Sequence, residues 1–149
     1  MRGQVKDVYG ASYKGGITRR TIVNVPSGST IRLNRIFGGG YGVTNTKPCD
    51  VYESNVNYHS ASAMAVGSPD DIVDGNQTAG GIYGGNNNCR RTLYARINID
   101  VPVRQNEAGY TSRVFGAGYG KDTWAQYTEI NLNNGEAKIG RAVHRNAET

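Results

Sequence analysis

The stretch Val114-Phe115-Gly116-Ala117-Gly118-Tyr119-Gly120 places a β-branched residue and an aromatic residue before a glycine-rich corner. The same order of residue types begins three more times along the 149-residue chain, at Val8, Ile36 and Ile82. The starting positions 8, 36, 82 and 114 are separated by 28, 46 and 32 residues. Self-similarity with a period of roughly 20–50 residues indicates a repeat architecture. Repetition is therefore the property of this chain that decides its fold.

A second phrase alternates with the first and consists of an asparagine between two apolar or aromatic residues. Its four copies are Val23-Asn24-Val25, Val56-Asn57-Tyr58, Ile97-Asn98-Ile99 and Ile130-Asn131-Leu132. They follow the starts of the first phrase by 15, 20, 15 and 16 residues, which indicates that both phrases belong to one repeating unit. The long second step predicts an insertion in one unit, at about residues 59–81. A degenerate fifth copy is predicted to begin at Ile139.

Each unit has the residue pattern of β-strands. The segments 21–25, 30–37 and 94–101 alternate apolar and polar residues, and many of the apolar ones are β-branched. This period of two is typical of strands, whereas no stretch of about a dozen residues has the apolar spacing of a helix. The 21 glycines also disfavour helices, because each costs about 1 kcal/mol in a helix interior. Turn-forming sequences such as Pro26-Ser27-Gly28 mark the predicted strand ends.

A unit of about 28–32 residues with short strands and glycine corners is typical of one coil of a parallel β-helix. We therefore predict an all-β fold, a right-handed parallel β-helix (solenoid) of about four to five coils. Residues 1–149 form a single domain in this prediction, and residues 59–81 form a lateral loop. Stacked coils would place equivalent residues about 4.8 Å apart.

That stacking predicts two rows of equivalent side chains. One is an aromatic stack of Tyr9, Phe37, Tyr83 and Phe115. The other is a ladder of the four phrase asparagines. Their apolar neighbours point to the opposite face of the strand, so we expect the asparagines to face mostly outward. An inward ladder at a corner is the alternative.

Together the two phrases resemble the glycine-rich repeats of large bacterial surface proteins. The resemblance rests on the Val/Ile-Phe/Tyr-Gly-Gly-Gly-Tyr phrase and on strands of the Ile-Asn-Ile type, and it covers about residues 8–141. Such proteins are predicted or known right-handed parallel β-helices, and many are adhesin-like. The resemblance thus implies a β-helix with a structural or adhesive function. Unequal unit lengths and the insertion depart from a regular array, so uniform array geometry is not implied.

Two pairs of arginines are the candidate ligand-binding residues. The chain carries 17 basic and 12 acidic residues, giving a net charge of +5. Arg19-Arg20 and Arg90-Arg91 each precede a threonine and lie upstream of the asparagine phrase, so aligned units would gather them into a basic strip. An anionic polysaccharide is the partner that such a strip fits, and ordinary surface arginines are the alternative. Nucleic acid is not favoured, because no nucleic-acid-binding module is recognisable.

Both cysteines of the chain belong to a candidate disulfide. Cys49 lies seven residues before Val56, and Cys89 lies eight residues before Ile97. Adjacent strands about 4.8 Å apart fall within the Cα separation of roughly 4.4–6.8 Å that a disulfide tolerates. A bond would close a loop of about 40 residues and contribute about 3–4 kcal/mol. Two free thiols are the alternative, and zinc is not predicted because neither histidine has ligand spacing.

Acidic residues provide the only candidates for a metal site. Asp70, Asp71 and Asp74 precede a glycine and an asparagine, where carboxylates could hold a cation. Their spacing is not that of an EF-hand, and a solvated loop is the simpler interpretation. No cofactor is predicted.

Catalysis would require carboxylates on neighbouring coils, as in β-helix glycosidases and lyases. Two loosely aligned pairs could supply them: Glu53 with Glu129, and Asp50 with Asp122. His59 and His144 form no nucleophilic constellation with a serine or cysteine. The sequence therefore favours a protein without catalytic activity.

The functional prediction is a non-catalytic structural or adhesive module of an extracellular or cell-surface assembly. Solenoid ends without caps present bare strand edges, so we expect self-association, with end-to-end stacking as one form of it. The alternative is a polysaccharide-binding or polysaccharide-cleaving β-helix, like a tailspike or a lyase. No transmembrane run and no signal-peptide pattern is present. We therefore expect no membrane insertion and expect the chain to be a piece of a longer surface protein.

Overall fold

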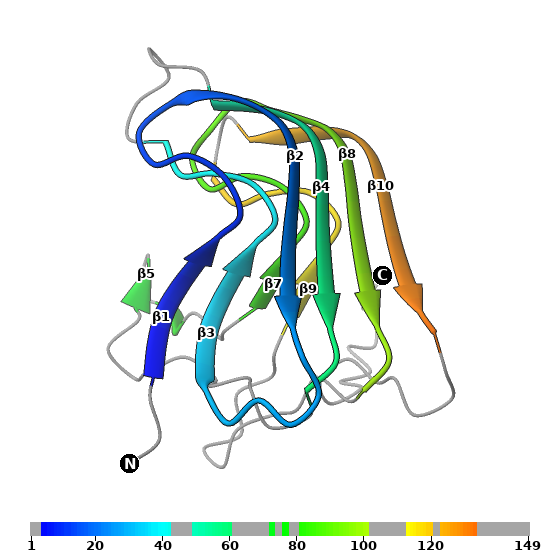
Figure 1. Ribbon diagram of the computed structural model, residues 1–149. Coiled ribbons are helices and arrows are strands. Elements are labelled where there is room, and N and C mark those ends of the chain that lie inside the picture. The colour runs from blue at the N-terminus through cyan, green and yellow to red at the C-terminus, as the bar shows by residue number, and fades with distance from the viewer. Residues whose placement is uncertain are drawn as a thin grey trace, which may run out of the picture.

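The computed structural model describes residues 4–42, 49–60, 72–73, 76–77, 81–101, 113–120 and 123–133 (Figure 1). All regular elements in these ranges are β-strands, and no helix is present among them. Eight of the strands form two four-stranded sheets in which neighbouring strands run parallel. The prediction of an all-β fold is therefore confirmed.

Consecutive strands alternate between the two sheets. The first sheet contains, in spatial order, β1 (Gln4–Tyr9), β3 (Arg32–Phe37), β7 (Gly81–Tyr83) and β9 (Arg113–Phe115). The second contains β2 (Gly16–Val25), β4 (Cys49–Tyr58), β8 (Arg91–Ile99) and β10 (Trp124–Leu132). Each repeat thus adds one strand to each sheet. Within the range 59–81, β5 (Ile72–Val73) and β6 (Asn76–Gln77) pair antiparallel with each other.

The register of both sheets follows the sequence repeat. In the second sheet the four phrase asparagines align in one row. In the first sheet the starting residues of the first phrase align in another, Val8 with Ile36, Ile36 with Ile82 and Ile82 with Val114. At the corners between the sheets, isolated parallel bridges join Tyr13 to Tyr41, Tyr41 to Asn87 and Asn87 to Tyr119. Equivalent residues of successive repeats therefore lie side by side.

The long strands of the second sheet bend part-way along their length (Figure 1). In β4 the bend is visible in the burial pattern, because Val51 and Ser54 are buried whereas Tyr52 is exposed and Glu53 half-buried. A straight strand alternates strictly between its two faces. Two successive outward residues therefore mark a turn of the strand around the core.

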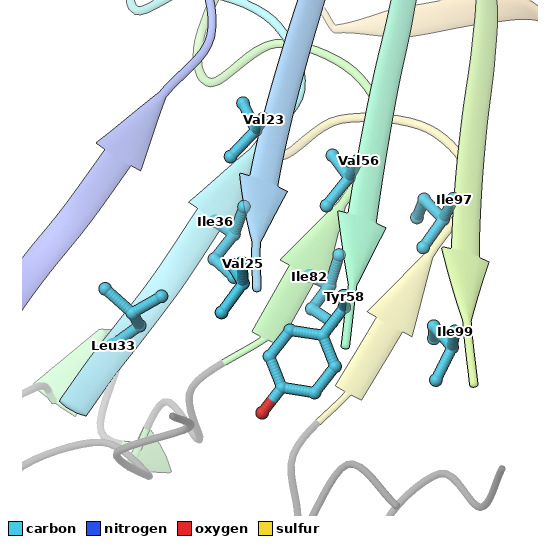
Figure 2. Close-up of a cluster of buried hydrophobic side chains, with 9 residues drawn as sticks. All are labelled: Val23, Val25, Leu33, Ile36, Val56, Tyr58, Ile82, Ile97 and Ile99. Atoms are coloured by element: carbon cyan, nitrogen blue, oxygen red, sulfur yellow. The ribbon is translucent and has the colours of Figure 1, made fainter. Parts of the chain in front are cut away.

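The hydrophobic core lies between the two sheets (Figure 2). Its side chains come from five strands, β2, β3, β4, β7 and β8: Val23, Val25, Leu33, Ile36, Val56, Tyr58, Ile82, Ile97 and Ile99. Each fully buried apolar side chain of this kind contributes about 1.5–3 kcal/mol. On β10, Ile130 and Leu132 align with Ile97 and Ile99 and continue these core positions, but they are 40% and 49% exposed. The core row is therefore less covered on β10 than on the inner strands.

Glycines of the first phrase let the two sheets approach closely beside the corner. A Cβ atom at Gly38 would overlap the carbonyl oxygen of Gly84 and lie 3.1 Å from Ser54 Cβ. The residues of the second sheet that face the glycine row are correspondingly small, and they form one register row of Thr21, Ser54, Ala95 and Thr128. This complementarity of glycines and small residues fixes how each corner returns to the second sheet.

The predicted aromatic stack is confirmed. The ring centroids of Tyr9, Phe37, Tyr83 and Phe115 follow one another at 5.0, 4.7 and 5.0 Å. Successive ring planes differ by only 8°, 14° and 9°. Stacked pairs contribute about 0.5–1.5 kcal/mol each beyond their area burial. Phe37 in the middle is fully buried, whereas Phe115 at the end is 41% exposed.

Candidate functional site

A hollow on the outside of the second sheet gathers arginine and tyrosine side chains. Its volume is about 570 Å³, and its described lining residues are Ile17, Arg19 and Tyr52. The guanidinium carbon of Arg91 lies 5.9 Å from the centre of the Tyr52 ring, and Arg91 Nη2 lies 3.2 Å from Asp50 Oδ2. Because β4 lies between β2 and β8, Arg19 and Arg91 come from the strands on either side of Tyr52. We call this feature the arginine–tyrosine hollow.

The arginine–tyrosine hollow has the chemistry to hold an anionic ligand with an apolar face. Ile17 and Tyr52 are 69% and 44% exposed, so their apolar surfaces are open to a ligand. A guanidinium binds carboxylate, sulfate or phosphate groups through charge-assisted hydrogen bonds and also stacks on aromatic rings. Acidic sugars combine both chemical features.

One of the four predicted arginines, Arg19, lines this hollow, and a second, Arg91, lies against its tyrosine. Arg20 instead pairs with Glu53 at 3.6 Å, and their side chains are 62% and 36% exposed, so the pair adds little stability. Arg90 is exposed, and its backbone carbonyl accepts the Trp124 N–H at 3.0 Å. The four residues therefore do not form one continuous strip.

The predicted asparagine ladder is confirmed on the same outer face. Asn57 Nδ2 donates to Asn24 Oδ1 at 2.7 Å, Asn98 donates to Asn57 at 2.8 Å, and Asn131 donates to Asn98 at 2.9 Å. Every amide donates toward β2, so the ladder has a direction. Among the described residues, none donates to Asn131 Oδ1 and none accepts from Asn24 Nδ2. The ladder thus ends in an acceptor at β10 and in a donor at β2.

Tyr94 and Arg96 of β8 bind Glu129 of β10. The Tyr94 hydroxyl donates to Glu129 Oε2, as does Arg96 Nε at 3.1 Å, and Asn131 Nδ2 donates to Glu129 Oε1 at 2.7 Å. These hydrogen bonds, led by that from Tyr94, lower the pKa of Glu129 to about 2. Hydrogen bonds to Tyr94 and Glu129 raise the pKa of Arg96. A carboxyl that stays ionised at neutral pH accepts hydrogen bonds and is a poor general acid.

Of the two candidate carboxylate pairs, only Glu53 with Glu129 lies wholly within the described residues. Glu53 aligns with Tyr94, whereas Glu129 aligns with Arg96, so the two acids are two strands and two register positions apart. Strand spacing and rise per residue then give a Cα separation of roughly 12 Å. Glu53 pairs with Arg20 and Glu129 with Arg96, so each acid has its own cation. Asp122 of the other pair lies outside the described residues.

A second hollow lies beside β1 and β3 at the corner that leads to β2. Its volume is about 340 Å³. Its lining consists of three tyrosines and three charged residues, namely Lys6, Asp7, Tyr9, Tyr13, Arg35 and Tyr41. Burial raises the pKa of Tyr9 to about 12, which keeps its hydroxyl neutral. We call this feature the tyrosine hollow, and no single stretch of sequence could have revealed it, because its residues come from two repeats.

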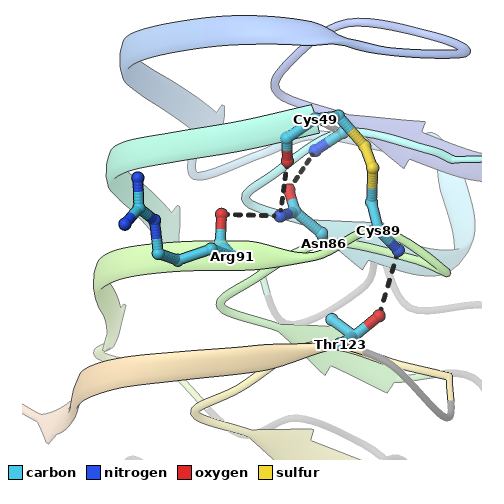
Figure 3. Close-up of a disulfide and its surroundings, with 6 residues drawn as sticks. Cys49, Asn86, Cys89, Arg91 and Thr123 are labelled. Atoms are coloured by element: carbon cyan, nitrogen blue, oxygen red, sulfur yellow. Dashed lines mark hydrogen bonds between the residues drawn. A yellow bond between two sulfur atoms is a disulfide. The ribbon is translucent and has the colours of Figure 1, made fainter. Parts of the chain in front are cut away.

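The structure joins Cys49 and Cys89 in a disulfide, with a Cα–Cα distance of 5.6 Å (Figure 3). Cys49 opens β4, and Cys89 precedes β8, the neighbouring strand. Both cysteines are buried. The bond therefore links two successive repeats at the corner where the chain enters the second sheet.

Asn86 beside the disulfide is a structural residue to which the sequence analysis gave no role. Its side chain is fully buried. Asn86 Nδ2 donates to the carbonyl oxygens of Cys49 and Arg91, each at 3.0 Å, and Asn86 Oδ1 accepts the Gly40 N–H at 2.8 Å (Figure 3). A Cβ atom at Gly39 would overlap this amide. The glycine run of the preceding repeat thus makes room for an asparagine that satisfies the corner's backbone groups.

The candidate cation residues Asp70, Asp71 and Asp74 lie outside the described residues, as does the fifth copy at Ile139. In the part of the chain that the structure describes, no group of three histidine, cysteine or carboxylate side chains is placed to hold a metal ion. Within those same ranges, no helix has the length and apolar character to span a membrane.

Comparison of the chain with known proteins gave no match among protein-family models, curated proteins or solved structures. Function is therefore inferred from the two hollows, the polar outer face and the ends of the sheets.

Proposed function

We propose that this chain is a non-catalytic structural and adhesive module of a cell-surface or extracellular assembly. The observation that carries the proposal is the unbroken register of the repeats, each pairing with the next in both sheets. A repeat that contacts only its neighbours extends a scaffold without the need for a deep central core.

Its fold, in this proposal, is a right-handed parallel β-helix of stacked coils. The alternation of strands between two parallel sheets supports a coil, and so do the bridges that join successive corners. The bend of the long strands supplies a further side for each coil (Figure 1). Right-handedness follows the general rule for crossovers between parallel strands, which are right-handed in about 98% of cases.

End-to-end association is the assembly that this proposal includes. Ile130 and Leu132 occupy the rows that continue the core, yet they are 40% and 49% exposed on β10. The asparagine ladder ends there in an acceptor, while Asn24 at the opposite end offers a donor. The β2 edge of a second copy would supply Val23, Asn24 and Val25 in the matching register. Such a head-to-tail contact does not close on itself and forms filaments.

Light scattering over a range of protein concentrations tests the assembly. We expect the average mass to rise with concentration and electron microscopy to show rods. The variant Leu132→Lys should remain monomeric, because a charge would be buried in the core row of the next copy. Ser27→Lys adds the same charge in an exposed turn and should assemble normally. A wild-type chain that stays monomeric at high concentration would contradict end-to-end assembly.

Polysaccharide binding is the second candidate function, and the arginine–tyrosine hollow is the observation that favours it. Its cation, ring and apolar surface suit an acidic polysaccharide. The double variant Arg19→Ala/Tyr52→Ala should lose retention on an acidic polysaccharide column in dilute salt. Release of shortened sugars by the wild-type chain would instead indicate the cleaving alternative.

A further inference from the structure

We propose that the tyrosine hollow binds a sugar residue that carries a carboxylate, as a site separate from the arginine–tyrosine hollow. This inference goes beyond the structural role, because stacking of repeats requires no ring-lined hollow. Three independent features of the hollow support it.

The first feature is an exposed aromatic platform. Tyr13 and Tyr41 are stacked with centroids 5.2 Å apart and planes 12° from parallel. Tyr13 is 66% exposed and Tyr41 is half-buried, so the platform faces solvent mainly through Tyr13. The Tyr9 ring lies 5.6 Å from Tyr41 at 59°, which makes the surface concave. A concave surface of tyrosine rings packs well against the C–H face of a pyranose ring.

The second feature is a fixed polar network beside the platform. Arg35 binds Asp7 through two hydrogen bonds of 2.6 Å, and the two side chains are only 15% and 18% exposed. The Tyr9 hydroxyl accepts a hydrogen bond from Asn87 Nδ2 at 2.9 Å, and it lies 3.4 Å from Asp7 Oδ2. Groups that are already held in place need little ordering when a ligand binds. Such a network can donate to and accept from sugar hydroxyls.

The third feature is Lys14, which holds an unusual backbone conformation next to Tyr13. Its φ is 67°, and the equivalent residues after the corner bridge in the third and fourth repeats, Asn88 and Gly120, have φ of 50° and 107°. Asparagine and glycine tolerate this left-handed region, whereas a lysine is strained there. Backbone strain of this kind clusters at binding sites.

Lys14 and its neighbours decide the charge of the ligand. Lys14 Nζ lies 5.1 Å from the centre of the Tyr13 ring. Because Arg35 is paired with Asp7, the cation that the described residues place at the platform is Lys14. A strained lysine on an aromatic platform suits a carboxylate on the sugar that the platform holds.

Calorimetric titration of the full chain with an oligogalacturonate, in dilute buffer, tests the proposal. The matched ligand is the same oligosaccharide with its carboxyl groups reduced to alcohols. Tyr13→Ala should lower the affinity for both ligands by about tenfold, because it removes half of the platform. Lys14→Gly should lower the affinity for the oligogalacturonate alone, by about five- to tenfold. The same change should raise the unfolding midpoint by a few degrees, because it releases backbone strain.

Asn88→Gly is the control, since it makes the same backbone change at the equivalent position of another repeat and should leave both affinities unchanged. Tyr13 and Lys14 lie in the first repeat just before β2, whose edge the proposed assembly also uses. Light scattering on each variant therefore accompanies the titration, and a variant that loses sugar binding but keeps the wild-type scattering separates this site from the assembly. Absence of binding to the wild-type chain would overturn the proposal. So would binding that survives Tyr13→Ala and is lost in Arg19→Ala, which would place the sugar in the arginine–tyrosine hollow.

Discussion

At the scale of single residues, close packing around the corner depends on a glycine, because Gly38 meets both the next repeat and the second sheet. Gly38 leaves room for the Gly84 carbonyl, and the Thr21 hydroxyl donates to the Gly38 carbonyl from the facing strand. Any side chain at Gly38 would have backbone on one side and Ser54 on the other. Since backbone atoms cannot rotate away, the two successive repeats themselves would have to separate.

We predict that Gly38→Ala lowers the free energy of unfolding by about 1–3 kcal/mol, the range for adding a methyl group to a packed interior. Urea unfolding followed by tryptophan fluorescence or circular dichroism measures this. Gly28→Asn is the matched control, because no atom lies within 4 Å of a Cβ there and its φ of 81° suits asparagine. Equal losses in the two variants would show that the Gly38 contact is not the cause.

At the scale of elements, β10 differs from the inner strands because its side chains are mostly exposed. In compensation, polar groups on the outer face hold it to β8, and Glu129 accepts two hydrogen bonds from that strand, from Tyr94 and from Arg96. A carboxylate whose pKa is lowered by folding stabilises the folded state above its unfolded pKa of about 4.3. That stabilisation disappears as the pH falls toward the folded pKa of about 2.

We therefore predict that Glu129→Gln lowers the thermal unfolding midpoint at pH 7, since the amide binds Arg96 and Tyr94 more weakly than a carboxylate. The difference between the variant and the wild type should shrink as the pH falls from about 4.5 toward about 2, because protonation removes the same charge from the wild type. Scanning calorimetry across this pH range provides the measurement. A difference that stays constant down to pH 2 would contradict the role given to the charge.

At the scale of the whole molecule, stability is predicted to be highest in the middle of the stack. β4 and β8 pair on both sides, whereas β2 and β10 each pair on one side among the described residues. Val56 and Ile97 are fully buried, whereas Ile130 in the same row is 40% exposed. Because each repeat is stabilised mainly by its neighbours, the ends should open first.

Hydrogen exchange should therefore show slow amides in β4 and β8 and faster ones in β2 and β10. The proposed end-to-end assembly adds a second expectation, since raising the protein concentration should slow exchange in β2 and β10 alone. Exchange at one uniform rate through all four strands would instead indicate a single cooperative unit. Mass spectrometry after exchange at two protein concentrations distinguishes these outcomes.

The sequence by itself determined the repeat, the strand type and the two side-chain rows. The aromatic stack and the asparagine ladder followed from it because parallel, in-register pairing brings equivalent positions of successive repeats together. The pairing of Cys49 with Cys89 could be anticipated as one of two alternatives for the same reason. Periodicity along a chain is a local property, so it is readable without a structure.

Tertiary structure alone decided what lies around the corners. Asn86 and the two hollows depend on how far the strands bend and on which side chains meet there. The same holds for the arginines, since Arg20 pairs with Glu53 whereas Arg91 lies against Tyr52. A bend in a strand changes which residues share a face, and the sequence pattern does not record the angle of that bend. Side-chain geometry at corners therefore emerges only when the sheets are packed.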